Sequence, residues 1–107
     1  MMKIFRKLIR DNMPVIMEAQ GKHLKTRILN DEEFLPALEN KLLEETQELR
    51  TDPAESKPAK IAYIYEILDY IVRATGSTPE QIETIRKEDF VKKGGFDKKL
   101  FLEGEGE

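Results

Sequence analysis

Residues 38–49, with the sequence LENKLLEETQEL, decide the fold of this 107-residue chain. Asn30, with Glu33 three residues later, has the spacing of a capping box at the start of a helix. The sequence therefore predicts a helix from this cap to about Arg50, kinked or starting later because Pro36 lies inside it. Leucines spaced three, four and seven residues apart form its core-facing stripe: Leu35, Leu38, Leu42 and Leu49.

Proline, glycine and capping residues mark three further helices. We expect a short one over residues 14–20, a third over about 58–74 and a fourth that opens at Thr78 and ends before Gly94. No run alternates with period two, so little sheet is expected. The predicted class is all-α, a compact bundle-like domain of four helices over residues 1–107. Its acidic tail, 103–107, is expected to be disordered.

The third helix is apolar on nearly all sides. Residues 61–72 read IAYIYEILDYIV and carry only two charges, Glu66 and Asp69. A helix of this kind must be covered on most of its surface, and a chain of this length has few elements to cover it. We therefore expect a homodimer or a higher homo-oligomer to complete the bundle.

Composition excludes several classes of function. The net charge of −3 argues against general binding to nucleic acid or to a membrane surface, since both need an excess of basic residues. The absence of cysteine excludes disulfides and thiolate metal sites. No signal peptide or membrane-spanning stretch is recognised, so a cytoplasmic location is expected.

Glu45 and Glu48 are the strongest candidates for chemistry. Glu45 lies on the leucine stripe, between Leu42 and Leu49, and Glu48 shares that side of the helix. Two carboxylates turned toward a core need a positive partner, and no lysine or arginine is expected on the neighbouring turns of that face. A magnesium or manganese ion would meet this need, because both prefer oxygen ligands. The alternative is that both glutamates reach solvent at the rim of the stripe.

Glu66 and Asp69 repeat this spacing on the third helix. Two helices joined by a polar loop normally lie antiparallel, which would let the two carboxylate pairs face each other and hold one or two metal ions. The alternative is a solvent-exposed stripe on which Asp69 pairs with Arg73. A third group of candidates is basic: Lys7 and Arg10 near the first helix and Lys93 before two glycines could hold phosphate.

Four segments resemble the MazG-like and phosphoribosyl-ATP pyrophosphohydrolase-like family of all-α nucleotide pyrophosphatases. They are KLIRDNMP, LLEETQEL, IAYIYEILDYI and KKGGFDKKLFL, in this order along most of the chain. The resemblance implies a helical bundle that hydrolyses nucleoside triphosphates to monophosphate and pyrophosphate with magnesium, often to clear unwanted nucleotides. It implies Glu45 and Glu48 as metal ligands, Glu44 as the carboxylate that orients the attacking water, and Lys7, Arg10 and Lys93 at the phosphates.

The second half of the family's metal motif admits two alignments. In one, Glu66 and Asp69 supply its two carboxylates and the chain is a hydrolase. In the other, which fits the apolar pattern better, Lys60 and Tyr63 stand at the two ligand positions. The chain would then keep the bundle without the activity and act as a regulatory or dimerisation module. The side chains of the third helix that face Glu45 distinguish the two.

Overall fold

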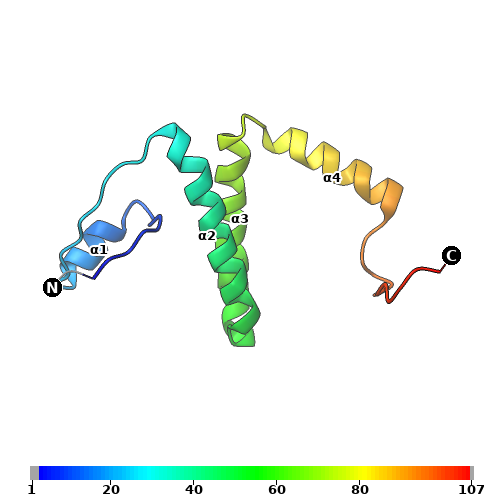
Figure 1. The fold of residues 1–107 in the computed structure, drawn as a ribbon, viewed down its shortest axis with the longest axis horizontal. Coiled ribbons are helices and arrows are strands. Elements are labelled where there is room, and N and C mark those ends of the chain that lie inside the picture. Colours follow the sequence, from blue (N-terminus) through cyan, green and yellow to red (C-terminus); the bar gives the residue numbers. More distant parts are fainter. Residues whose placement is uncertain (1–2, 107) are drawn as a thin grey trace. The chain divides into compact units, whose positions relative to one another are not determined.

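The computed structural model describes residues 3–106, and all of its regular structure is helical (Figure 1). Within this range the chain forms no strand, so the all-α class predicted from the sequence is confirmed. The expected helices all form, close to their predicted bounds. The elements are α1 (Met13–Ala19), α2 (Asp31–Thr51), the 3-10 turn η1 (Ala54–Ser56), α3 (Lys57–Ala74) and α4 (Pro79–Lys93).

The predicted helix caps are present in the structure. The side chain of Asn30 accepts from the backbone N–H of Glu33 at 2.9 Å, and the Glu33 carboxylate accepts from the backbone N–H of Asn30 at 3.2 Å. Thr78 and Gln81 form the same reciprocal pair at the start of α4. Pro36 lies inside α2 and does not delay its start, because the Asn30 cap fixes the first turn.

Arg27 adds charge to the cap of α2. Its guanidinium donates to both carboxylate oxygens of Glu33, at 3.1 and 2.8 Å. These bonds, together with the one from Asn30, hold the pKa of Glu33 at about 2, below its ordinary value of 4.5. The cap is therefore charged and fully formed at neutral pH.

The low pKa of Glu33 predicts an acid-sensitive component of stability. A carboxylate with a lower pKa in the folded chain than in the unfolded one stabilises the fold above pH 4.5. That contribution is lost as the pH falls from 4.5 toward about 2. We expect Glu33→Gln to flatten this part of the curve of unfolding free energy against pH, measured by urea titration. Glu39→Gln, on an exposed residue of the same helix, is the control; equal curves for both variants would contradict the prediction.

The described chain divides into two units, one up to Gly76 and one from Ser77 onward. The first contains α2 and α3, which lie side by side and antiparallel as an α-hairpin (Figure 1). Its apolar core consists of Leu38 from α2 and of Ile64 and Ile67 from α3. Of the predicted core-facing leucines, Leu38 is thus buried, while Leu35, Leu42 and Leu49 are half-buried. The second unit contains α4 and the residues after it, and the packing of four helices into one domain stays a prediction.

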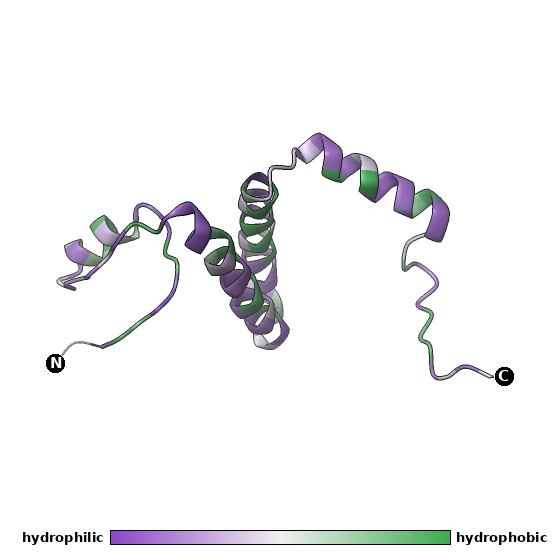
Figure 2. Ribbon diagram, turned by 45° about the horizontal axis from the view of Figure 1, so that its top comes forward, coloured by the Kyte–Doolittle hydropathy of each residue, from purple (hydrophilic) through white to green (hydrophobic). Residues whose placement is uncertain are grey.

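One side of α3 is left uncovered in its own unit. Ile61, Tyr65 and Leu68, spaced four and three residues apart, are 40, 71 and 42% exposed. We call these three residues the α3 stripe. The sequence predicted that this helix is covered on most sides, whereas α2 covers only the face with Ile64 and Ile67. In Figure 2 the helices of the hairpin carry both hydrophobic and hydrophilic residues, while α4 is mainly hydrophilic.

Candidate functional site

Glu45 is buried in the hairpin, as its position on the leucine stripe predicted. Its side chain is only 5% exposed, whereas that of Glu48, one turn later, is 47% exposed. The helix therefore places one carboxylate inside and the other at the rim. A buried carboxylate needs positive partners within the protein.

Two lysines supply these partners. The Lys60 ammonium, from α3, pairs with Oε2 of Glu45 and lies 2.7 Å from Oε2 of Glu48. Lys41, from the preceding turn of α2, lies with its Nζ 3.4 Å from Oε1 of Glu45. Each oxygen of the buried carboxylate thus faces an ammonium. We call Lys41, Glu45, Glu48 and Lys60 the Lys60 cluster.

The electrostatics of the Lys60 cluster favour its charged form. Hydrogen bonds to Glu45 and then to Glu48 raise the pKa of Lys60 above its usual range. The hydrogen bond from Lys60 is the main cause that lowers the pKa of Glu48. Within the cluster two ammonium groups face two carboxylates, so opposite charges are paired.

Glu66 and Asp69 form ion pairs with residues outside the Lys60 cluster. Glu66 pairs with Arg10, whose Nη2 lies 2.7 Å from its carboxylate, and Asp69 pairs with Arg73 at 2.5 Å on the same helix. Both pairs are exposed to solvent. Among the described residues, no three acidic or histidine side chains gather in a way that could hold a metal ion. The structure therefore does not bring the two carboxylate pairs together.

Tyr63 lies one turn after Lys60 on α3. Its ring centroid lies 5.8 Å from Nζ of Lys41 and 5.2 Å from the guanidinium carbon of Arg10. Cations stack on an aromatic ring at such distances. Lys60 is thus the residue of α3 that meets Glu45 and Glu48, whereas Tyr63 contacts Lys41 and Arg10.

A magnesium ion does not fit the residues present. It would need several oxygen ligands, but the side chains that pair with Glu45 bring ammonium groups. Oε2 of Glu45 accepts from Lys60 and Oε1 lies 3.4 Å from the ammonium of Lys41, so a divalent ion would be repelled by both lysines.

The remaining predicted site residues have separate neighbours. Glu44 is partly exposed, with its carboxylate 3.9 Å from Nζ of Lys41. The ammonium of Lys7 lies 5.3 Å from the ring centroid of Phe5. Lys93 belongs to the other unit, where it lies 3.8 Å from Asp89. Their assignment to phosphate binding stays a prediction.

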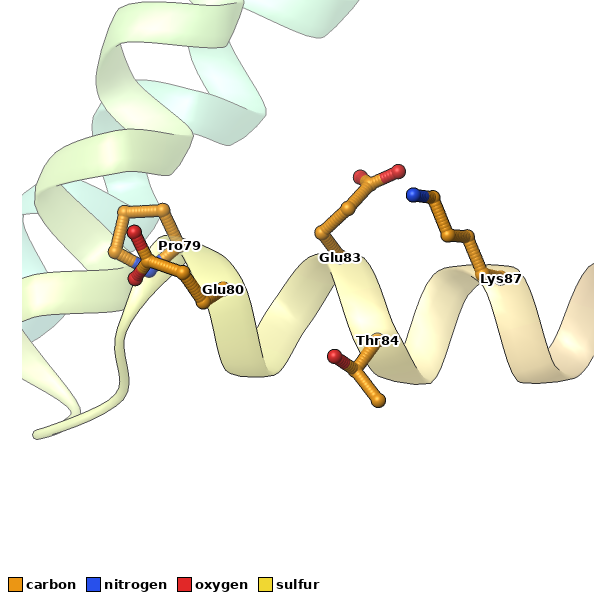
Figure 3. A pocket seen from close by; sticks show the side chains of 5 residues that line it. All are labelled: Pro79, Glu80, Glu83, Thr84 and Lys87. Carbon is orange, nitrogen blue, oxygen red and sulfur yellow. The ribbon is translucent and has the colours of Figure 1, made fainter.

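Two open surface hollows lie along α4. One is lined by Pro79, Glu80, Glu83, Thr84 and Lys87, all from this single helix (Figure 3). In Figure 3 the carboxylate of Glu83 and the ammonium of Lys87 point toward one another, while Thr84 points away. Glu83 is also paired with Arg86 at 2.6 Å. With one helix as its only wall, the hollow cannot enclose a ligand.

Sequence reasoning missed Lys41. The expectation that no basic residue lies on the neighbouring turns of the Glu45 face is wrong, because Lys41 precedes Glu45 by four residues and is buried beside it. The i, i+4 spacing that places two side chains together on a helix was a sufficient signal. Lys57 was missed as well, and no local spacing marks it: its ammonium donates to the carbonyl oxygen of Leu49 across the hairpin.

Among residues 3–106, no helix has the length and apolar character needed to cross a membrane. Comparison with known proteins finds no matching family model, no matching curated protein and no matching solved structure.

Proposed function

We propose that this chain is a non-catalytic, MazG-like helical module that acts by associating with a second copy of itself in the cytoplasm. The observation that carries the proposal is the position of the Lys60 ammonium, which binds Glu45 and Glu48 where the family resemblance implies magnesium. Hydrolysis of a phosphoanhydride by this family's route needs the metal to polarise the phosphoryl oxygens and to activate water. An ammonium group in its place supplies neither a coordinated water nor open ligand positions.

The α3 stripe supports the association. Its three large apolar side chains lie in the middle of a well-formed helix, next to a core of only three buried apolar residues. A face of this kind on a small unit marks an interaction surface. A second copy is the partner that the sequence already implies, because a two-fold axis brings the same apolar face from each subunit together.

The competing proposal is a magnesium-dependent nucleoside triphosphate pyrophosphohydrolase, and one assay separates the two. We expect no release of pyrophosphate from a panel of canonical and modified nucleoside triphosphates, with either magnesium or manganese present. Sedimentation velocity of the same preparation should give a species of twice the chain mass. Release of pyrophosphate that Glu45→Gln abolishes would overturn the proposal in favour of the hydrolase. A monomer at all accessible concentrations would overturn the association.

A further inference from the structure

We infer that the Lys60 ammonium is the resident cation of Glu45 and Glu48, so that this acidic pair is closed to divalent ions, and that the side chain at position 60 decides which cation the pair holds. The inference deepens the proposed function, on whose non-catalytic character it rests. It follows from three features of the Lys60 cluster: which oxygens are taken, how the charges balance and what lies on α3 one turn later.

Each oxygen of the buried Glu45 carboxylate lies close to a lysine ammonium. Oε2 of Glu45 accepts from Lys60 and Oε1 lies 3.4 Å from the ammonium of Lys41. The same Lys60 ammonium reaches Glu48 at 2.7 Å, so it bridges the two carboxylates in the way a bound cation would. A divalent ion at this point would have to displace Lys60 and would then lie beside Lys41.

The charge balance opposes such a displacement. The cluster holds two ammonium and two carboxylate groups, and its side chains at positions 41 and 45 are only 10 and 5% exposed. A divalent ion in place of the Lys60 ammonium would add one positive charge beside Lys41, and uncompensated charge near a buried side chain is costly. The tethered ammonium also needs no transfer from solution, since α3 carries it to the pair when the hairpin forms.

The next turn of α3 supplies no replacement ligand. Tyr63 presents its ring to Lys41 and Arg10, and the nearest carboxylate further along, Glu66, is engaged by Arg10 at 2.7 Å. Tyr63 and Glu66 therefore interact with cations rather than with Glu45 or Glu48. A carboxylate at position 60 would lie on the side of α3 that faces Glu45 and Glu48. It would complete a set of three acidic ligands.

The test uses Mn²⁺ alone, without nucleotide, and follows the free ion by electron paramagnetic resonance. We expect the wild-type chain to leave Mn²⁺ free at concentrations where Lys60→Glu binds one ion, a difference of at least about tenfold in affinity. Lys60→Glu should also show a thermal upshift with Mn²⁺ that chelation reverses. Lys92→Glu, with the same change of charge in α4, is the matched control and should behave as wild type.

Two outcomes would overturn the inference when Lys60→Glu folds. One is stoichiometric binding of Mn²⁺ by the wild-type chain that Glu45→Gln removes. The other is a folded Lys60→Glu that binds Mn²⁺ no better than Lys92→Glu does. If Lys60→Glu does not fold, Lys60→Gln replaces it, because it frees the pair without adding charge; it should bind Mn²⁺ more tightly than wild type, and equal affinity would overturn the inference. None of these readouts involves pyrophosphate release or association, so failure here is distinct from failure of the proposed function.

Discussion

Glu45→Gln is expected to destabilise the hairpin by about 3–5 kcal/mol, because it removes one partner from a buried ion pair and leaves the others in place. The ammonium of Lys41, itself buried, would lose the nearer of its two carboxylates and keep only Glu44 at 3.9 Å. The amide keeps the size of the side chain, so the loss reports on charge and not on packing. Urea unfolding followed by circular dichroism, in the presence of a chelator, measures the change.

Glu48→Gln is the matched control for this variant. The side chain of Glu48 is 47% exposed and shares Lys60 with Glu45, so water replaces much of what the substitution removes. We expect its cost to stay below about 1 kcal/mol.

The sign of the Glu45→Gln effect also separates the two interpretations of the site. If Glu45 and Glu48 formed a metal site, a chelator would remove the ion and leave two carboxylates that repel each other. A metal site therefore predicts that Glu45→Gln leaves the free energy of unfolding unchanged or raised.

Leu68→Glu is expected to dissociate the proposed dimer. Leu68 lies at the end of the α3 stripe and is 42% exposed in its own unit, so it has apolar area left to bury against a partner. Loss of that burial amounts to roughly 1.5 kcal/mol per copy. In a two-fold interface the change occurs twice, and the new carboxylates add their own cost of desolvation. The dissociation constant should therefore rise at least about a hundredfold.

Sedimentation velocity over a dilution series measures this shift. Ala62→Glu is the control, because Ala62 is an exposed residue of the same helix that belongs to the stripe with Glu66 and Asp69 rather than to the α3 stripe. It should leave the association unchanged, and both variants should keep the helical circular dichroism of the wild type. Equal dissociation constants for Leu68→Glu and wild type would contradict a dimer formed through the α3 stripe.

Local sequence determined most of the secondary structure. Asn30 and Thr78 cap α2 and α4 because their side chains accept from backbone N–H groups only three residues away. Such interactions depend on neighbours in the chain and so can be predicted from it. The inward position of Glu45 was equally local, since the leucines at positions 42 and 49 fix which side of α2 faces the core.

Tertiary structure decided which residue of α3 meets Glu45. Lys60, Glu66 and Asp69 all lie on α3, and helical periodicity alone does not say which of them comes opposite a residue on α2. The register of the hairpin does, and it is set by the short connection through η1 and by Lys57, whose ammonium bonds the carbonyl oxygen of Leu49. That register brings Lys60 to Glu45, whereas Glu66 pairs with Arg10 from the segment before α1. The sequence by itself determined a buried carboxylate on an α-helix with Lys41 one turn before it, and the packing of the two helices added the Lys60 ammonium as its second partner.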